Sequence, residues 1–243
     1  MNQADEILAL KQKQCYTFED LLAVTRILRS ENGCPWDREQ DHHSIRSELI
    51  EETYEVIEAI DNEDAALLQE ELGDLLFQII FHAQIESERD CFAMREVIHD
   101  ITAKMVHRHP HVFGDVSVEN SAQVLSNWEV IKTEEKQRNT LVDKLRAIPP
   151  MLPALMRASK VGKKIGQAEG EDAEALLDAL ERQITLARAS LKEEGNDPNR
   201  VVGELLMRTT DLSRALGVNA EYALSKETDA LIARVAENSL KKS

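Results

Sequence analysis

The sequence predicts an all-α protein. Leu, Ile, Ala and Glu are abundant in this chain of 243 residues, whereas aromatic residues make up 4% of it and there are 9 Gly and 6 Pro. Such a composition favours helix over strand. Apolar residues also recur at the three- and four-residue intervals of amphipathic helices along nearly every segment. The length allows one large domain or two small ones.

The first predicted helix begins after Thr17, because Thr17 to Asp20 resembles a capping box. It stops before Gly33 and Pro35. Further helices are predicted over residues 44–60, 64–88, 94–107 and 121–136, with an irregular loop over 109–115. We expect several apolar side chains of the second and third of these helices to point inward: Ile45, Leu49, Val56, Ile60, Leu68, Leu72, Leu75, Leu76, Ile79 and Ile80. Gly73 lies in mid-helix, which suggests a close approach of a second helix.

The chain has one candidate linker, residues 146–153, which contain three of its six prolines. We therefore predict domains at 1–145 and 154–243. Residues 73–76 (Gly-Asp-Leu-Leu) reappear as 203–206 (Gly-Glu-Leu-Leu), an offset of 130 residues. At that offset Glu52, Glu55 and Glu71 correspond to Arg182, Thr185 and Val201. The C-terminal part is therefore predicted to be a degenerate second helical repeat without the carboxylates of the first.

Two carboxylate pairs, Glu52 with Glu55 and Glu71 with Asp74, carry the clearest functional signal. Each pair has i,i+3 spacing, so its members share one face of a helix. The pairs lie almost symmetrically about the polar run 61–64, which is typical of a tight helix–helix turn. If the two helices fold back on each other, all four carboxylates meet. Oxygen ligands without His or Cys suit a hard divalent cation, Mg²⁺ above all.

The charge around these pairs supports this hypothesis. Residues 47–88 contain 13 acidic side chains and no Lys or Arg. A solvated helix face normally carries both signs, so the missing countercharge is consistent with a metal. The alternative is a helical scaffold whose acidic stripe is only solvated surface.

Composition also excludes several classes. A net charge of −16 disfavours long contacts with polymeric nucleic acid or an anionic membrane. Three widely spaced cysteines fit neither a disulfide framework nor a zinc pattern, and suit a reducing cytoplasm. No basic and apolar leader is recognisable at the N-terminus, and no apolar run approaches the ~20 residues of a transmembrane helix.

Several motifs resemble one known family. Residues 51–55 (Glu-Glu-Thr-Tyr-Glu) followed by 71–74 (Glu-Leu-Gly-Asp) are similar to the EExxE and ExxD motifs of MazG-type nucleoside triphosphate pyrophosphohydrolases. Residues 33–37, 108–115 and 127–132 resemble the other landmarks of that family, in the same order. The resemblance covers about residues 17–160. It implies an all-α, MazG-like helical bundle, a homodimer, and Mg²⁺-dependent release of pyrophosphate from nucleoside triphosphates, with Mn²⁺ as a substitute metal.

The resemblance also implies roles for individual residues. It assigns metal ligation to Glu52, Glu55, Glu71 and Asp74, in agreement with the spacing argument, and phosphate contacts to Lys104 and Arg108, which share a helix face. The remaining candidates have residue types that suit a role at the substrate. Glu51 could orient or deprotonate the attacking water, Trp128 and Trp36 could stack on the base, and Lys132 could reach a phosphate.

Alternatives remain open for most of these residues. Glu51, Lys104 and Arg108 could be solvated surface charges, Trp128 a core residue, and Trp36 a plug at the end of the bundle. The histidines at 107, 109 and 111 lack a convincing fourth zinc ligand. The carboxylate set could also serve a regulator that senses nucleoside triphosphates or alarmones without turnover.

Overall fold

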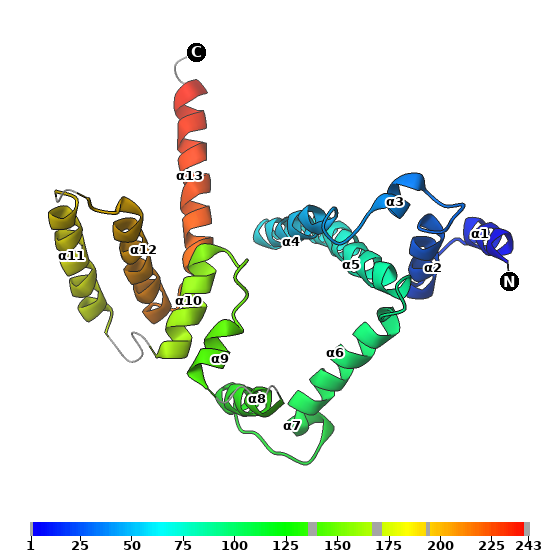
Figure 1. The fold of residues 1–243 in the computed structure, drawn as a ribbon, viewed down its shortest axis with the longest axis horizontal. Helices are drawn as coiled ribbons and strands as arrows, with labels where there is room; N and C mark the ends of the chain where they lie inside the picture. Colours follow the sequence, from blue (N-terminus) through cyan, green and yellow to red (C-terminus); the bar gives the residue numbers. More distant parts are fainter. Residues whose placement is uncertain (1, 136–139, 167–171, 193–194, 241–243) are drawn as a thin grey trace. The chain divides into compact units, whose positions relative to one another are not determined.

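A computed structural model describes residues 2–135, 140–166, 172–192 and 195–240. Over these ranges the chain forms α-helices and no strands, so the predicted fold class is confirmed (Figure 1). The chain divides into two compact units, Met1–Val124 and Leu125–Ser243, and each is described here by itself. Within the described ranges, no helix is both long enough and apolar enough to span a membrane.

The first unit is built around an antiparallel helical hairpin, α4 (Arg46–Asp61) and α5 (Ala65–Ser87). Helices α2 (Phe18–Leu28) and α6 (Met94–Arg108) pack on α5. Ile45, Phe81 and Ile85 form a buried cluster, with Phe77 packed against it. The hairpin is therefore the scaffold on which the candidate ligands lie.

Most of the predicted helices are present within a residue or two of their expected ends. The capping box at Thr17 is also confirmed, because Asp20 N donates to Thr17 Oγ1 and Thr17 N donates to the Asp20 carboxylate. Gly33 fits a tight loop after α2, where a Cβ atom would collide with the carbonyl oxygens of Ile27 and Leu28. Four short helices were not predicted: α1 (Gln3–Gln12), α3 (Pro35–Glu39), α7 (Pro110–Phe113) and α9 (Leu141–Arg146).

Some predicted core positions are wrong for the chain taken alone. Leu72 is 49% exposed, Ile79 40% and Ile60 55%. They lie on faces of the hairpin that no other described helix covers. A Cβ atom added at Gly73 would meet no described atom of another helix within 4 Å, so no close helix approach explains this glycine. Apolar periodicity predicts a helix face, but not whether that face is covered within the same chain.

The second unit repeats the hairpin arrangement with α11 (Ala173–Ser190) and α12 (Pro198–Ala215). Helices α10 (Ala154–Ile165) and α13 (Ala220–Leu240) pack on α12, and α9 (Leu141–Arg146) packs on α10. Asp211 is 1% exposed and pairs with Arg214, whose guanidinium lies against Gly162. The second unit is therefore held together by contacts between its own helices, and these contacts include a buried ion pair.

Helix α8 (Ser121–Glu135) spans the division between the units, and the predicted helix end at Lys136 lies outside the described residues. No helix covers the Pro-rich residues 147–153. The units divide between Val124 and Leu125, about 20 residues before the predicted linker. The domain boundaries expected from the sequence, at residues 145 and 154, therefore stay a prediction.

Candidate metal centre

The turn between α4 and α5 sets the register of the hairpin. Asn62 caps α4, Glu63 adopts a left-handed conformation (φ 54°), and Asp64 caps α5. The Asp64 carboxylate accepts hydrogen bonds of 3.0 Å from the backbone N–H groups of Ala66 and Leu67. The tight turn predicted at residues 61–64 is thus present, and it places the two ligand motifs opposite each other.

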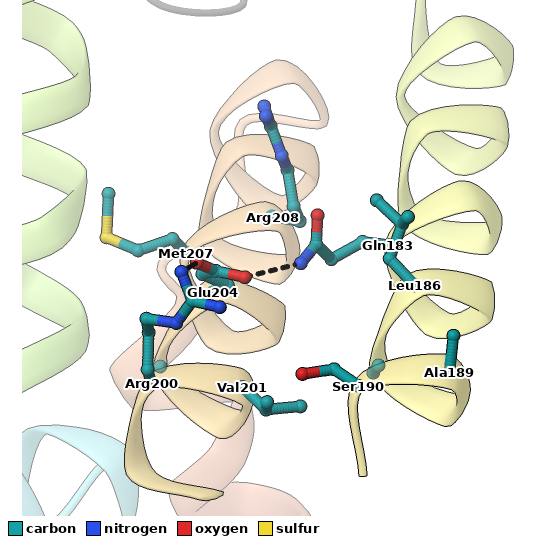
Figure 2. Close-up of a pocket in the computed structure, with 11 residues that line it drawn as sticks. Gln183, Leu186, Ala189, Ser190, Arg200, Val201, Glu204, Met207 and Arg208 are labelled. Atoms are coloured by element: carbon teal, nitrogen blue, oxygen red, sulfur yellow. Dashed lines mark hydrogen bonds and ion pairs between the residues drawn. The ribbon is translucent and has the colours of Figure 1, made fainter. Parts of the chain in front are cut away.

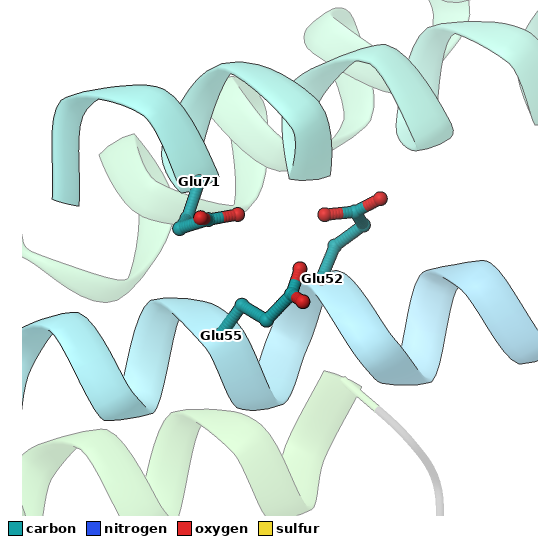
Figure 3. Close-up of side chains that lie close together, drawn as sticks. All are labelled: Glu52, Glu55 and Glu71. Carbon is teal, nitrogen blue, oxygen red and sulfur yellow. The ribbon is translucent and has the colours of Figure 1, made fainter. Parts of the chain in front are cut away.

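Three of the four predicted ligands converge between the helices. One carboxylate oxygen from each of Glu52, Glu55 and Glu71 lies within 4.8 Å of the others (Figure 3). We call these three residues the carboxylate cluster. Glu71 is buried and the other two are half-buried. Asp74, one turn beyond Glu71 on α5, is exposed and lies outside this group.

The cluster is electrostatically strained. Burial, a hydrogen bond with Glu55 and the charges of Asp74, Glu55 and Glu71 raise the pKa of Glu52 to about 7. Burial and the charge of Glu55 also raise the pKa of Glu71. Carboxylates packed this closely resist full ionisation unless a cation balances them. The charge of Asp74, the fourth predicted ligand, thus acts on Glu52 although Asp74 lies outside the cluster.

The other predicted residues of the first unit lie at different degrees of burial. Glu51 is exposed on α4, outside the carboxylate cluster. Lys104 is exposed on α6, whereas Arg108, one turn later at the end of the same helix, is only 7% exposed. A solvated basic helix end is therefore wrong for Arg108. A buried guanidinium is held by specific partners or by a ligand.

Trp36 is 60% exposed on α3, so a role as a plug of the bundle end is wrong. The loop that carries it is fixed by Arg29, which sequence reasoning missed. Arg29 donates to the backbone oxygens of Asp37 and Gln40 at 2.5 and 3.1 Å, and forms a bidentate pair with Glu88 at 2.9 Å. A single Arg at a helix end gives no sequence signal for such a role.

A histidine pair also anchors the segment before α4 to α5. The Nδ1 atoms of His42 and His82 lie 2.8 Å apart, and His42 Nε2 lies 2.6 Å from the Glu86 carboxylate. Burial and the neighbouring His42 lower the pKa of His82. These residues are separated by about 40 positions in sequence, so spacing alone could not reveal them.

Trp128 and Lys132 lie on α8 within the second unit, with the Lys132 ammonium 5.5 Å from the centre of the Trp128 ring. This contact confirms that they share a helix face. The Trp128 ring is therefore already in contact with the Lys132 ammonium of its own helix.

The α11–α12 hairpin of the second unit has a groove of about 840 Å³ between its two helices (Figure 2). Val201 and Glu204, which occupy the positions of Glu71 and Asp74 at the 130-residue offset, line it together with Arg200 and Arg208. Gln183 donates to the Glu204 carboxylate at 2.8 Å. The residues described along this groove form no carboxylate cluster.

Fold and site together define an all-α protein with an oxygen-donor cluster suited to a hard divalent cation. A family model for the MazG nucleotide pyrophosphohydrolase domain matches residues 40–113, which include α4, α5 and α6.

Similarity to named proteins extends over nearly the whole chain. The nucleoside triphosphate pyrophosphohydrolase of Escherichia coli (strain K12) is 39% identical over 251 residues, covering 98% of this chain and 87% of the relative. The nucleoside triphosphate pyrophosphohydrolase/pyrophosphatase MazG of Thermotoga maritima is 39% identical over 222 residues, covering 89% and 83% of the two chains. The chain therefore belongs to the MazG nucleotide pyrophosphohydrolase family.

Proposed function

We propose that this protein hydrolyses nucleoside triphosphates to nucleoside monophosphates and pyrophosphate, with Mg²⁺ bound at the carboxylate cluster. The observation that carries the proposal is the convergence of Glu52, Glu55 and Glu71 within 4.8 Å. The activity named for the similar proteins of E. coli and T. maritima supports the same reaction.

The residues present fit Mg²⁺. The cluster offers carboxylate oxygens only, which are the ligands that Mg²⁺ prefers. Burial and the neighbouring carboxylates raise the pKa values of Glu52 and Glu71, and a divalent cation would relieve the repulsion between these groups. Asp74, one turn from Glu71 on α5, would complete the ligand set. When bound, Mg²⁺ would neutralise phosphate charge and lower the pKa of the attacking water.

Lys104 and Arg108 would hold the phosphates. They are one turn apart on the same face of α6, and few cations are present in a unit this acidic. Arg binds phosphate oxygens in a bidentate manner and Lys acts as a point charge, so together they would stabilise the departing pyrophosphate.

Other residues would serve the water and the base. Glu51 is exposed on α4 next to Glu52, where it could accept a proton from water. Trp36 is exposed and could close over the base, while Trp128 and Lys132 would contact base and phosphate.

The active form would be a homodimer located in the cytoplasm. Four apolar residues of α4 form an exposed stripe at i, i+4, i+7 and i+10: Ile50, Tyr54, Ile57 and Ile60. Leu72 and Ile79 of α5 are exposed as well. Contiguous apolar faces of this kind mark protein interfaces. Three free cysteines suit a reducing compartment.

Pyrophosphate release tests the proposal. Purified protein should release one pyrophosphate per nucleoside monophosphate from a panel of canonical and modified nucleoside triphosphates with Mg²⁺, and none with excess EDTA. A protein that binds these nucleotides with Mg²⁺ but turns none of them over would instead be a nucleotide-sensing regulator.

A further inference from the structure

Helix α13 (Ala220–Leu240) extends well past its packing partners in the second unit (Figure 1). It contacts α10 and α12, yet every side chain described from Leu224 to Ser239 is exposed. Four of these are large and apolar and are between 53% and 63% exposed: Leu224, Leu231, Ile232 and Val235. A helical run of about 15 residues is marginal in water without tertiary contacts. This run therefore needs a partner to stay helical.

Three of these apolar residues, together with Thr228, follow a coiled-coil spacing. Leu224, Thr228, Leu231 and Val235 are separated by four, three and four residues, which are the d, a, d and a positions of a heptad. All four lie on one stripe of α13, and Ile232 widens that stripe at an e position. The partner that fits such a seam is another helix with the same spacing.

The flanking charges identify the partner and its direction. Glu227 and Arg234 both occupy g positions. When two copies of one helix pair in antiparallel fashion, each g position faces the other copy's g position. Glu227 then lies opposite Arg234 of the partner subunit, and the pair occurs twice by symmetry.

The same antiparallel register aligns the apolar layers. Leu224 meets Val235 of the partner subunit, and Thr228 meets Leu231 of the partner subunit, again twice each. A parallel pairing would instead place Glu227 beside Ile232 of the partner subunit and leave Arg234 without an acidic partner. Only the antiparallel register therefore satisfies both the apolar seam and the charges.

We propose that α13 pairs in antiparallel fashion with α13 of a second copy of this chain, through the seam Leu224, Thr228, Leu231 and Val235. This deepens the homodimer of the proposed function, but its test needs neither substrate nor turnover. The degenerate second unit then has a role in assembly that requires no carboxylate cluster.

Charge reversal tests the pairing in the full-length protein. Glu227→Arg and Arg234→Glu each replace two attractive contacts with two repulsive ones, so each should weaken self-association about tenfold. The double variant restores opposite charges and should return the dissociation constant to within about threefold of wild type. Sedimentation velocity over a dilution series measures these constants. Unchanged single variants, or a double variant weaker than either, would overturn the proposal.

A core variant with a matched control separates the seam from general surface effects. Leu231→Glu places a charge in each of the two Leu231–Thr228 layers of the seam and should weaken association at least about a hundredfold. Ala233→Glu adds the same charge at an outward f position of α13 and should leave the constant unchanged. Equal constants for both variants would contradict the seam.

Disulfide trapping tests the direction. With Cys15, Cys34 and Cys91 replaced by Ser, a mixture of Thr228→Cys and Leu231→Cys proteins should form mixed disulfides under mild oxidation. Disulfides between identical variants would indicate a parallel pair, and no disulfide at all would mean that α13 does not self-associate. Either result overturns the antiparallel assignment.

Discussion

The two units contain the same helical hairpin but differ in net charge. The first unit has 26 Asp and Glu against 10 Lys and Arg, so the whole net charge of −16 belongs to it, whereas the second unit has 19 of each. Glu71 is a buried carboxylate on α5, and its counterpart Val201 is a buried apolar residue on α12. The second hairpin thus folds without the buried carboxylate of the first. Apolar packing stabilises the helices of both hairpins, and the polar residues between the helices determine only the chemistry.

The comparison also identifies the energetic cost of the site. Burial and like charges disfavour ionised carboxylates at Glu52 and Glu71, as their raised pKa values report. The second hairpin avoids this cost at Val201. A protein keeps strained, like-charged groups where a ligand relieves them, so we expect the first hairpin to be the functional one.

The largest effect should follow from Glu71→Gln. It keeps the shape of the side chain but removes a ligand charge, so turnover should fall at least about a thousandfold, since removing one stabilising group in a site already costs on the order of 10²–10³. The metal-free protein should be as stable as wild type or more so, because repulsion falls. Pyrophosphate release and thermal melts in EDTA check both parts.

The neighbouring Glu70→Gln is the control for this variant, because Glu70 is exposed on the same helix outside the cluster. It should retain turnover within about twofold of wild type. Comparable turnover in the Glu71→Gln and Glu70→Gln proteins would mean that the cluster is not the reactive centre.

A smaller effect is expected for Lys104→Ala. Loss of a phosphate contact should cost on the order of 2–4 kcal/mol of transition-state stabilisation, or roughly 30- to 1000-fold in turnover. Mn²⁺ affinity should not change, because Lys104 is not a ligand. Lys11→Ala, at another exposed lysine of the first unit, is the control and should behave as wild type. Normal kinetics for Lys104→Ala would move the phosphate site elsewhere.

A pH dependence distinguishes the hairpins further. The pKa of Glu52 is raised from 4.5 to about 7, so the folded protein binds this proton more tightly than the unfolded chain. The resulting stabilisation is complete below the unfolded pKa and is lost as pH rises through about 7. In EDTA the melting temperature should therefore fall between about pH 5 and about pH 8, and this fall should be smaller in Glu52→Gln.

Mg²⁺ should oppose that trend, because ligation requires ionised carboxylates and affinity rises with pH. Melting curves with and without Mg²⁺ at several pH values measure the difference. An identical pH profile for wild type and Glu52→Gln would show that Glu52 does not titrate in this range.

The smallest effect should come from the second hairpin. Glu204→Gln alters the counterpart of Asp74 and keeps an acceptor for the Gln183 side chain. Turnover should stay within about twofold of wild type and the free energy of unfolding within about 0.5 kcal/mol, as for most surface substitutions. A large loss of turnover would give the second unit a catalytic part.

Sequence predicted the features that depend on local spacing. The α4–α5 hairpin, its turn and the meeting of Glu52, Glu55 and Glu71 all follow from helical periodicity about residues 61–64. Periodicity could not tell that Asp74 is exposed or that Arg108 is buried, because both depend on which other helices cover a face. The contacts of Arg29 and His42 join distant segments and left no local signal.

Mn²⁺ binding distinguishes most directly whether the first hairpin, and not the second, holds the catalytic cation. Electron paramagnetic resonance should count bound Mn²⁺ in wild type, Glu71→Gln and Glu204→Gln, beside pyrophosphate release by each. We predict that Glu71→Gln loses both Mn²⁺ and turnover, whereas Glu204→Gln keeps both. Retention of Mn²⁺ and turnover in Glu71→Gln, or their joint loss in Glu204→Gln, would contradict the assignment of the cation to the first hairpin.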